Sequence, residues 1–389
     1  MFIADRMKAV GSAIFSEMAE LKQLELDKGK QVVDLSIGTP DLPPPVHVIE
    51  AMREALLQPD SFHYSLKGSQ QLHQVIADWY QERFAVSLNT DTEILTLMGS
   101  QDGLAHLPMA ILNLGDLALI PDPGYPIYFS SVELAGGTIY KMPLIEENGF
   151  LPDLQNIPEQ VARKAKIMIL NYPSNPVSAI ADMSFFEQVI AFAHKYEILV
   201  VHDLAYSELC FDGYKPPSLL EVDRAKDVAV EINSLSKSYN MAGARIGFMV
   251  GNASIIRTLA MLKGNIDYGV FKVVQAGAIA ALTGGTNYCA EMSKVYERRR
   301  DVLIKGFSEL GWNIEPPKAT MFVWAKIPQG FTSRDFAVAL LQKAGISVIP
   351  GDAFGEMGEG YVRIGLVQDE QAIKQAIQQL KVSDLRNCF

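Results

Sequence analysis

Lys237, Asp203 and Tyr206 are the residues whose types and places in the sequence best suit catalysis. Asp203 and Tyr206 come after the apolar run ILVV (198–201), and Lys237 comes after VAVEIN (228–233). Ligands of an open α/β sheet bind beyond the carboxyl ends of its strands, so these side chains are expected to share one site. An amine beside a buried acid predicts Schiff-base chemistry, in which the lysine attacks a carbonyl carbon.

An anion site is expected at the same edge of the sheet. Ser100 and Gln101 follow the strand-like EILTLMG (93–99) and open a helix, where free backbone N–H groups and the helix dipole favour negative charge. Arg363 stands in the apolar run YVRIGLV (361–367), where a buried guanidinium needs a partner. The residues alone allow that partner to be either a protein carboxylate or a ligand.

The elements that must position these residues alternate between strands and helices from about 92 to 250. Apolar runs predict strands at 93–99, 117–123, 166–173, 198–206, 228–236 and 244–251, and helical periodicity predicts helices at 103–114, 126–136 and 184–197. Because the strands are apolar throughout, they are expected to form a mostly parallel sheet with helices on both faces. The predicted fold class is therefore α/β.

A mixed pattern of helices and strands begins near residue 285. Helices are expected at 273–284, 288–311 and 333–345, and strands at 320–327, 346–350 and 361–367. The sequence thus predicts three parts, which are an N-terminal arm (1–45) that packs on the small domain, a large domain (46–284), and a C-terminal small α+β domain (285–389).

Composition and charge limit the partners of the chain. Its 389 residues carry a formal net charge of −11, which argues against nucleic acid and anionic membranes because both attract clustered positive charge. We find neither a secretory signal nor an apolar run of about 18 residues that could span a membrane. The 3 cysteines are far apart, which fits a reducing cytoplasm and predicts no CxxC metal site. HExxH, P-loop and GxSxG motifs are also absent.

Ordered motifs along nearly the whole chain resemble the class I aminotransferases, which are pyridoxal-phosphate enzymes of fold type I. The motifs are SIGTPD (36–41), YSLKGSQQL (64–72), GSQDG (99–103), PDPGYPIY (121–128), NYPSNP (171–176), HDLAYSEL (202–209), NSLSKSYNMAGARIG (233–247) and YVRIG (361–365). The resemblance implies pyridoxal 5′-phosphate as cofactor and a seven-stranded sheet in the large domain. It also implies a cytoplasmic homodimer with active sites at the subunit interface.

The resemblance gives each catalytic candidate a role. Lys237 is expected to bind the cofactor aldehyde and, once the substrate amine displaces it, to move the proton at the substrate's Cα. Asp203 is expected to face the pyridine nitrogen and keep it protonated, so that the ring can accept electrons. Tyr206 and Asn175 match the positions that hydrogen-bond the cofactor's 3-oxygen.

Further residues match the family's phosphate-binding and ring-binding positions. The phosphate set is Ser100, Gln101, Ser234, Ser236 and Arg245. Tyr64 matches a tyrosine that reaches across the dimer interface to the phosphate of the neighbouring subunit. Tyr125 matches the aromatic residue that stacks on the cofactor ring.

The substrate is expected to be held by Gly38, Asn175 and Arg363. Arg363 matches the fork that binds the substrate α-carboxylate, for which a guanidinium is well shaped. Gly38 lies where the family brings backbone of the N-terminal arm over the substrate, and closure there would exclude water.

Within the class, the sequence is most similar to the LL-diaminopimelate aminotransferase group. It departs from the expected residues at Val177-Ser178, where Thr-Gly is usual, at Ala244, where that group has an aromatic residue, and at Tyr268, where a small residue is usual. These changes lie near the cofactor or the dimer interface, where they can reshape the substrate pocket.

The predicted reaction is amino-group transfer between an L-amino acid and a 2-oxo acid by a ping-pong cycle through pyridoxamine phosphate. LL-diaminopimelate and 2-oxoglutarate are the first candidate pair. A general alanine, aspartate or aromatic aminotransferase and a carbon–sulfur β-lyase on the same fold stay open. A regulator that uses this fold as an effector sensor fits less well, because the chain is acidic and no DNA-binding segment is visible.

Overall fold

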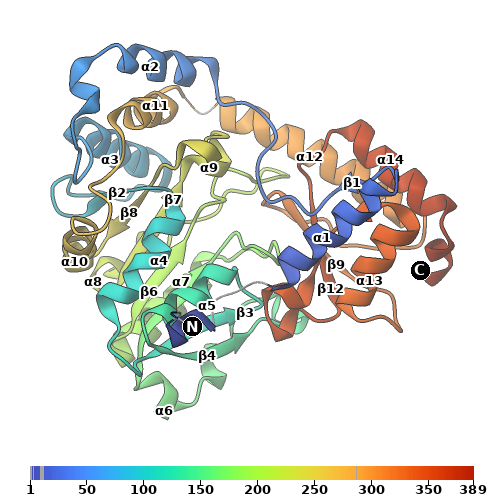
Figure 1. Cartoon of the computed structure of the whole chain (residues 1–389). Helices are drawn as coiled ribbons and strands as arrows, with labels where there is room; N and C mark the ends of the chain where they lie inside the picture. The colour runs from blue at the N-terminus through green and yellow to red at the C-terminus, as the bar shows by residue number, and fades with distance from the viewer. Residues whose placement is uncertain (1, 3, 9–12, 286) are drawn as a thin grey trace.

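The computed structural model describes residues 2, 4–8, 13–285 and 287–389, so part of the predicted arm lies outside the described residues. Figure 1 shows a larger body built around a sheet and a smaller body formed by the C-terminal part of the chain, with helix α1 (Ala13–Asp27) lying against the smaller one. Among the described residues, no helix is both long and apolar enough to cross a membrane.

The larger body contains a seven-stranded sheet in the order β2-β8-β7-β6-β5-β3-β4. Its strands are β2 (Ile94–Leu97), β3 (Leu117–Asp122), β4 (Thr138–Pro143), β5 (Ala165–Asn171), β6 (Leu199–Asp203), β7 (Ala229–Ser234) and β8 (Gly247–Gly251). All neighbouring pairs from β7 to β4 are parallel, and only β8 runs antiparallel to its neighbours. The predicted α/β fold with a mostly parallel sheet is therefore confirmed.

Helices cover both faces of this sheet because successive side chains of each strand point to opposite sides. One core contains Val200 of β6 and the helices α3 (Gln70–Phe84), α7 (Met183–Tyr196) and α11 (Lys272–Thr283), with α2 (Val46–Leu56) packed on α11. The other core contains Val201 and the helices α4 (Ser100–Ile111), α5 (Pro126–Leu134) and α10 (Ala253–Lys263). The alternation continues to the end of β6, so His202 and Asp203 face opposite sides.

The smaller body has a core of its own. Its three-stranded antiparallel sheet has the order β11-β12-β9, and β10 pairs with β1 of the N-terminal segment. The elements are β1 (Val33–Asp34), α12 (Asn287–Ser308), β9 (Phe322–Lys326), α13 (Ser333–Ala339), β10 (Ile346–Ser347), β11 (Ile349–Pro350), β12 (Tyr361–Gly365) and α14 (Glu370–Val382). Met18, Val33 and Leu35 of the N-terminal segment are buried in this core. The boundaries at 45 and 284 remain a prediction.

Two of the expected strands differ from the observed ones. The segment 198–206 is a strand only to Asp203, because the chain then turns and the Ser207 N–H donates to the Leu204 carbonyl. The segment 346–350 divides into β10 and β11, which belong to different sheets. Because β6 ends at Asp203, this residue lies at the carboxyl end of a central strand of the sheet.

Candidate functional site

A cavity of about 590 Å³ lies at the carboxyl ends of β5, β6 and β7. Every predicted site residue except Tyr64 lines it, namely Gly38, Ser100, Gln101, Tyr125, Asn175, Asp203, Tyr206, Ser234, Ser236, Lys237, Arg245 and Arg363. Its wall therefore combines the N-terminal segment, the larger body and β12 of the smaller body. Other residues line it to which the sequence motifs gave no role, among them Phe15, Ser36, Thr39, Tyr128, Asn171 and Phe322.

Lys237 lies on α9 (Leu235–Ser238), the single helical turn that follows β7. Its Nζ donates a hydrogen bond of 2.7 Å to the carbonyl oxygen of Gly38. Burial, together with the positive charges of Arg363 and Arg245, lowers the pKa of the Lys237 ammonium to about 8. A larger fraction of this amine is therefore uncharged near neutral pH than for an ordinary lysine, as a nucleophile or a base requires.

Asp203 ends β6 and is buried. Its Oδ2 accepts a 2.7 Å hydrogen bond from the Tyr128 hydroxyl, and its Oδ1 accepts one of 3.2 Å from the Ala205 N–H. Burial raises the pKa of the Asp203 carboxyl above its usual value, and the hydrogen bonds and the charges of His202 and Lys237 offset this effect only in part. Such a carboxylate favours a ligand that brings a protonated nitrogen.

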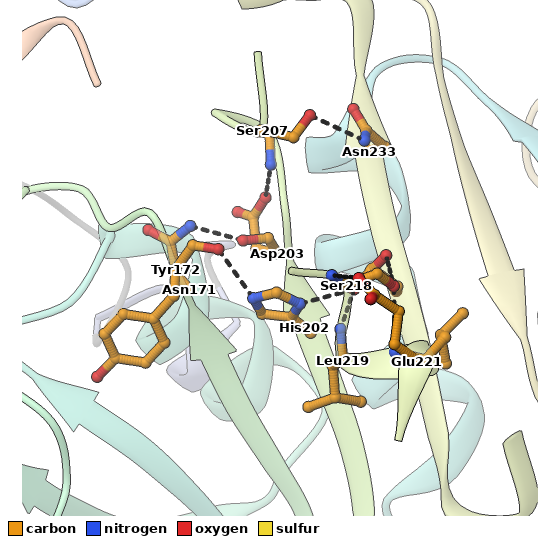
Figure 2. A network of polar contacts seen from close by, with 12 residues as sticks. Asn171, Tyr172, His202, Asp203, Ser207, Ser218, Leu219, Glu221 and Asn233 are labelled. Atoms are coloured by element: carbon orange, nitrogen blue, oxygen red, sulfur yellow. Dashed lines mark hydrogen bonds and ion pairs between the residues drawn. The ribbon is translucent and has the colours of Figure 1, made fainter. Parts of the chain in front are cut away.

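Asn171 joins Asp203 to the loop that carries Asn175. Its Nδ2 donates to the backbone carbonyl of Asp203 at 2.7 Å, which Figure 2 shows, and its Oδ1 accepts the Asn175 N–H at 2.7 Å. Asn171 is the last residue of β5, and its strand-end position in the sequence was the one signal that could have identified it. The backbone of Asn175 is thereby fixed at the cavity wall.

Arg363 is a buried cation with neutral partners. Its guanidinium lies over the rings of Phe322 and Phe354, 4.2 and 4.7 Å from their centroids. Its Nη1 donates to Asn175 Oδ1 at 2.9 Å and its Nη2 to the Ser36 carbonyl at 3.3 Å, while its Nε has no partner among the described residues. Burial lowers the pKa of this guanidinium to about 10. The arrangement suits an anionic ligand better than a structural ion pair.

Hydroxyl groups, backbone N–H groups and one guanidinium form a cup at another part of the wall. Ser100 and Gln101 begin α4, a helix of 12 residues whose N-cap is Gly99. A Cβ atom at Gly99 would lie 2.5 Å from Arg245 Nη2, so the glycine permits the close approach of that guanidinium. Ser234 caps α9 by accepting the Ser236 N–H at 3.2 Å. This donor set has the chemistry of a phosphate site.

The tyrosines take different places. Tyr125 precedes α5 and donates through its hydroxyl to Gln101 Oε1 at 3.2 Å. Tyr206 is buried beside Phe322, with 6.0 Å between the ring centroids. Tyr64 is 83% exposed and packs against Tyr268, with 5.1 Å between the rings, away from the cavity of its own chain.

The positions at which the sequence departs from its group lie outside the cavity wall. Val177, Ser178, Ala244 and Tyr268 do not line it, so within one chain they leave the pocket shape unaltered by direct contact. Ser178 instead shares a 2.8 Å hydrogen bond with Thr320 and donates to the Phe322 carbonyl at 2.9 Å, which ties its loop to the smaller body.

A group of potential metal ligands, Asp102, His106 and Asp267, lies next to the start of α4. The ammonium of Lys263, which is 1% exposed, forms ion pairs with both carboxylates. A protein cation therefore already supplies the positive charge at this place.

The cavity residues fit pyridoxal phosphate. The cup matches its phosphate, the Lys237 amine matches its aldehyde, and the buried carboxyl of Asp203 matches its pyridine nitrogen. The unpartnered Nε of Arg363 leaves a further anion site for a carboxylate on the substrate.

Comparisons with known proteins agree with this chemistry. Residues 30–380 match the family described as aminotransferase class I and II. The chain is 45% identical to an LL-diaminopimelate aminotransferase of Halothermothrix orenii, over 98% of this chain and 99% of that protein. It is also 45% identical to LL-diaminopimelate aminotransferase 2 of a Nostoc species, over 99% and 100% of the two chains.

Solved structures of aminotransferase-like proteins have the same fold. Substrate-bound BacF from Bacillus subtilis superposes with a TM-score of 0.94 at 38% identity, covering 98% of this chain and 97% of that one. A probable N-succinyldiaminopimelate aminotransferase from Thermus thermophilus gives a TM-score of 0.91 at 35% identity, covering 97% and 100%.

Proposed function

The chain belongs to the aminotransferase class I and II family and is a pyridoxal-phosphate-dependent aminotransferase, and we propose that its amino donor is LL-diaminopimelate and its acceptor 2-oxoglutarate. Relatives that are named for the diaminopimelate reaction and match over nearly the full length support this donor. The observation that carries the proposed site is Arg363, a buried guanidinium with neutral partners in the same cavity as Lys237.

In the proposed site the protein holds the cofactor at four places. Lys237 binds its aldehyde carbon, Asp203 holds a proton at its pyridine nitrogen, and Tyr206 and Asn175 donate to its 3-oxygen. The phosphate is bound by Ser100, Gln101, Ser234, Ser236 and Arg245. When bound, pyridoxal phosphate supplies an electron sink for the pair of electrons that remains when the substrate loses its Cα proton.

Arg363 orients the substrate. Its guanidinium donates to the α-carboxylate. The rings of Phe322 and Phe354 lie against the guanidinium and keep its plane in one orientation. Asn175, already bonded to Nη1, steadies the same fork. The N-terminal segment at Gly38 covers the substrate from the other side and excludes water.

Lys237 moves the proton. Once the substrate amine has displaced it, its Nζ would take up the proton that the substrate's Cα loses and would hand that proton on to the bound cofactor. A pKa near 8 suits this work, because a base is most effective when its pKa lies close to the working pH.

A donor screen tests the proposed substrate. Holoenzyme is mixed with LL-diaminopimelate, alanine, aspartate, glutamate or an aromatic amino acid, and loss of its yellow colour is followed with formation of glutamate from 2-oxoglutarate. We expect LL-diaminopimelate to give the highest kcat/KM. A higher value for another donor would replace the substrate, and release of pyruvate and ammonia without glutamate would indicate the β-lyase.

We further infer a cytoplasmic homodimer. The exposed Tyr64 and Tyr268 supply aromatic surface for a second copy of the chain, and Tyr64 would then reach the phosphate of the neighbouring subunit. The absence of a disulfide among Cys210, Cys289 and Cys388 supports a reducing compartment.

A further inference from the structure

His202 and Glu231 form a buried pair, and the alternation of side chains along β6 places His202 on the side of the sheet opposite to Asp203. They are cross-strand partners on β6 and β7, and both side chains are 0% exposed. His202 Nδ1 lies 2.8 Å from Glu231 Oε2, and its Nε2 lies 3.0 Å from the carbonyl oxygen of Tyr172. Both ring nitrogens therefore face an oxygen that can only accept, if Glu231 is ionised.

The contacts of Glu231 identify it as a carboxylate. Its Oε1 accepts from the Tyr80 hydroxyl at 2.9 Å and from the Ser218 hydroxyl at 2.8 Å, and its Oε2 accepts the Leu219 N–H at 3.0 Å. With His202 as a fourth donor, the anion has its acceptor sites filled. A neutral imidazole has one N–H group and would leave one ring nitrogen's lone pair facing a lone pair of oxygen.

The pair is connected to the cofactor site through the backbone. His202 directly precedes Asp203, and the carbonyl that its Nε2 contacts belongs to Tyr172, which directly follows Asn171. Asn171 in turn donates to the Asp203 carbonyl and holds the Asn175 backbone. The imidazole thus bridges the ends of β5 and β6 immediately behind the residues that line the cavity.

We propose that His202 is a doubly protonated imidazolium paired with Glu231, and that this ion pair is a positioning element that fixes Asp203 and keeps its carboxylate ionised. Neither residue touches the cavity, so both act through Asp203 and the strand ends. The proposal rests on the proposed role of Asp203. A positive charge behind Asp203 opposes the effect of burial on that carboxyl.

The protonation of His202 can be measured without turnover. In holoenzyme labelled with ¹⁵N-histidine, the His202 signals are assigned by their loss in His202→Gln. The groups around the ring are Glu231 of β7, Tyr80 of α3, the neighbouring Asp203, and the uncharged ring of Phe186 from α7. We expect both ring nitrogens to carry protons at neutral pH, because each of them faces an oxygen that accepts a hydrogen bond. An unprotonated Nδ1 or Nε2 at neutral pH would overturn the ion pair while leaving the proposed reaction intact.

Glu231→Gln tests the positioning role, because it removes the charge and nearly preserves the shape. We expect kcat to fall on the order of tenfold with a smaller change in KM, as for a partner that orients a directly acting group. The pH dependence of the holoenzyme's visible absorbance should shift as well, because Asp203 is less firmly ionised.

Tyr80→Phe is the matched control, since it removes one hydrogen bond to Glu231 and leaves the charges in place. It should be less stable than the parent and keep the parent's kcat and absorbance profile. If Glu231→Gln behaves like Tyr80→Phe in both readouts, the pair is merely structural and the proposal is wrong. Should Glu231→Gln not fold, His202→Gln is compared with Tyr80→Phe by the same two readouts and the same criterion.

Discussion

Two ionisable side chains of the site are buried with only neutral hydrogen-bond partners among the described residues. Lys237 and Arg363 are cations buried beside neutral oxygens, and the pKa of each is lowered by burial. The position of Lys237 after a strand and that of Arg363 within an apolar run could both be read from the sequence. Tyr128 could not, because its contact with Asp203 joins residues 75 positions apart and only the packing of α5 on one face of the sheet brings them together.

The pKa of Lys237 predicts how cofactor capture depends on pH. Only the uncharged amine attacks an aldehyde, and the pKa of about 8 means that this ammonium loses its proton well below the 10.5 of an ordinary lysine. The rate at which apoenzyme gains visible absorbance with pyridoxal phosphate should therefore rise from about pH 6 to 8 and level off above. A rate that still climbs steeply at about pH 10 would mean that Lys237 titrates as an ordinary lysine.

Arg363→Lys should weaken substrate binding. Lysine keeps the charge and loses the two-pronged contact, which costs about 2 kcal/mol and raises KM for the amino donor about 10- to 100-fold in steady-state assays. Arg298→Lys is the control, since Arg298 is 59% exposed and pairs with Glu370 at the surface. Equal KM values for the two variants would count against Arg363 as the carboxylate site.

The strands and helices position these residues in two ways. Side chains alternate between the two faces along each strand, and a helix begins shortly after a strand ends. Both were readable in the apolar runs, so β2, β3, β5, β6, β7 and β8 were predicted. The strand β4 was missed because it lies at the edge of the sheet, where TIYKMP is partly exposed and has no continuous apolar run. The division of 346–350 follows from two separate sheets that a local pattern does not encode.

The start of α4 can be tested with two glycines that have nearly the same positive φ. Gly99 has φ +81° and would place a Cβ 2.5 Å from Arg245, whereas Gly115 has φ +84° and nothing within 4 Å. Both alanine variants should lose about 1–2 kcal/mol of folding stability from the left-handed backbone. Only Gly99→Ala should also lose cofactor affinity, on the order of tenfold, in titrations of apoenzyme with pyridoxal phosphate. If the two variants bind the cofactor with equal affinity, Arg245 does not contribute to the phosphate site.

The whole molecule completes the cavity by bringing three distant parts of the chain together. The Gly38 carbonyl of the N-terminal segment accepts from Lys237 of the larger body, and Arg363 of the smaller body faces the same space. The net charge of −11 is a property of the whole chain, whereas the cavity wall carries the local cations Lys237, Arg245 and Arg363. Sequence motifs could indicate the members of the site, while their meeting depends on how the two bodies pack.

Complementation tests the role of Tyr64 across subunits. Lys237→Ala and Tyr64→Ala are each expected to be inactive or strongly impaired. In a mixed dimer, one site has Lys237 from one subunit and Tyr64 from the other. Random mixing makes half of the dimers mixed and gives one intact site in each, so about a quarter of the sites should recover. No recovery after verified subunit exchange would place Tyr64 outside the partner's site.

Borohydride reduction of the holoenzyme followed by peptide mapping tests the covalent role of Lys237 most directly. Reduction makes the bond between the amine and the cofactor permanent, and the added mass identifies the lysine. We predict modification of Lys237, with Lys263 unmodified as an internal control because its ammonium is held by Asp102 and Asp267. Cofactor on a different lysine, or none bound covalently, would contradict the assignment of Lys237 and the site built around it.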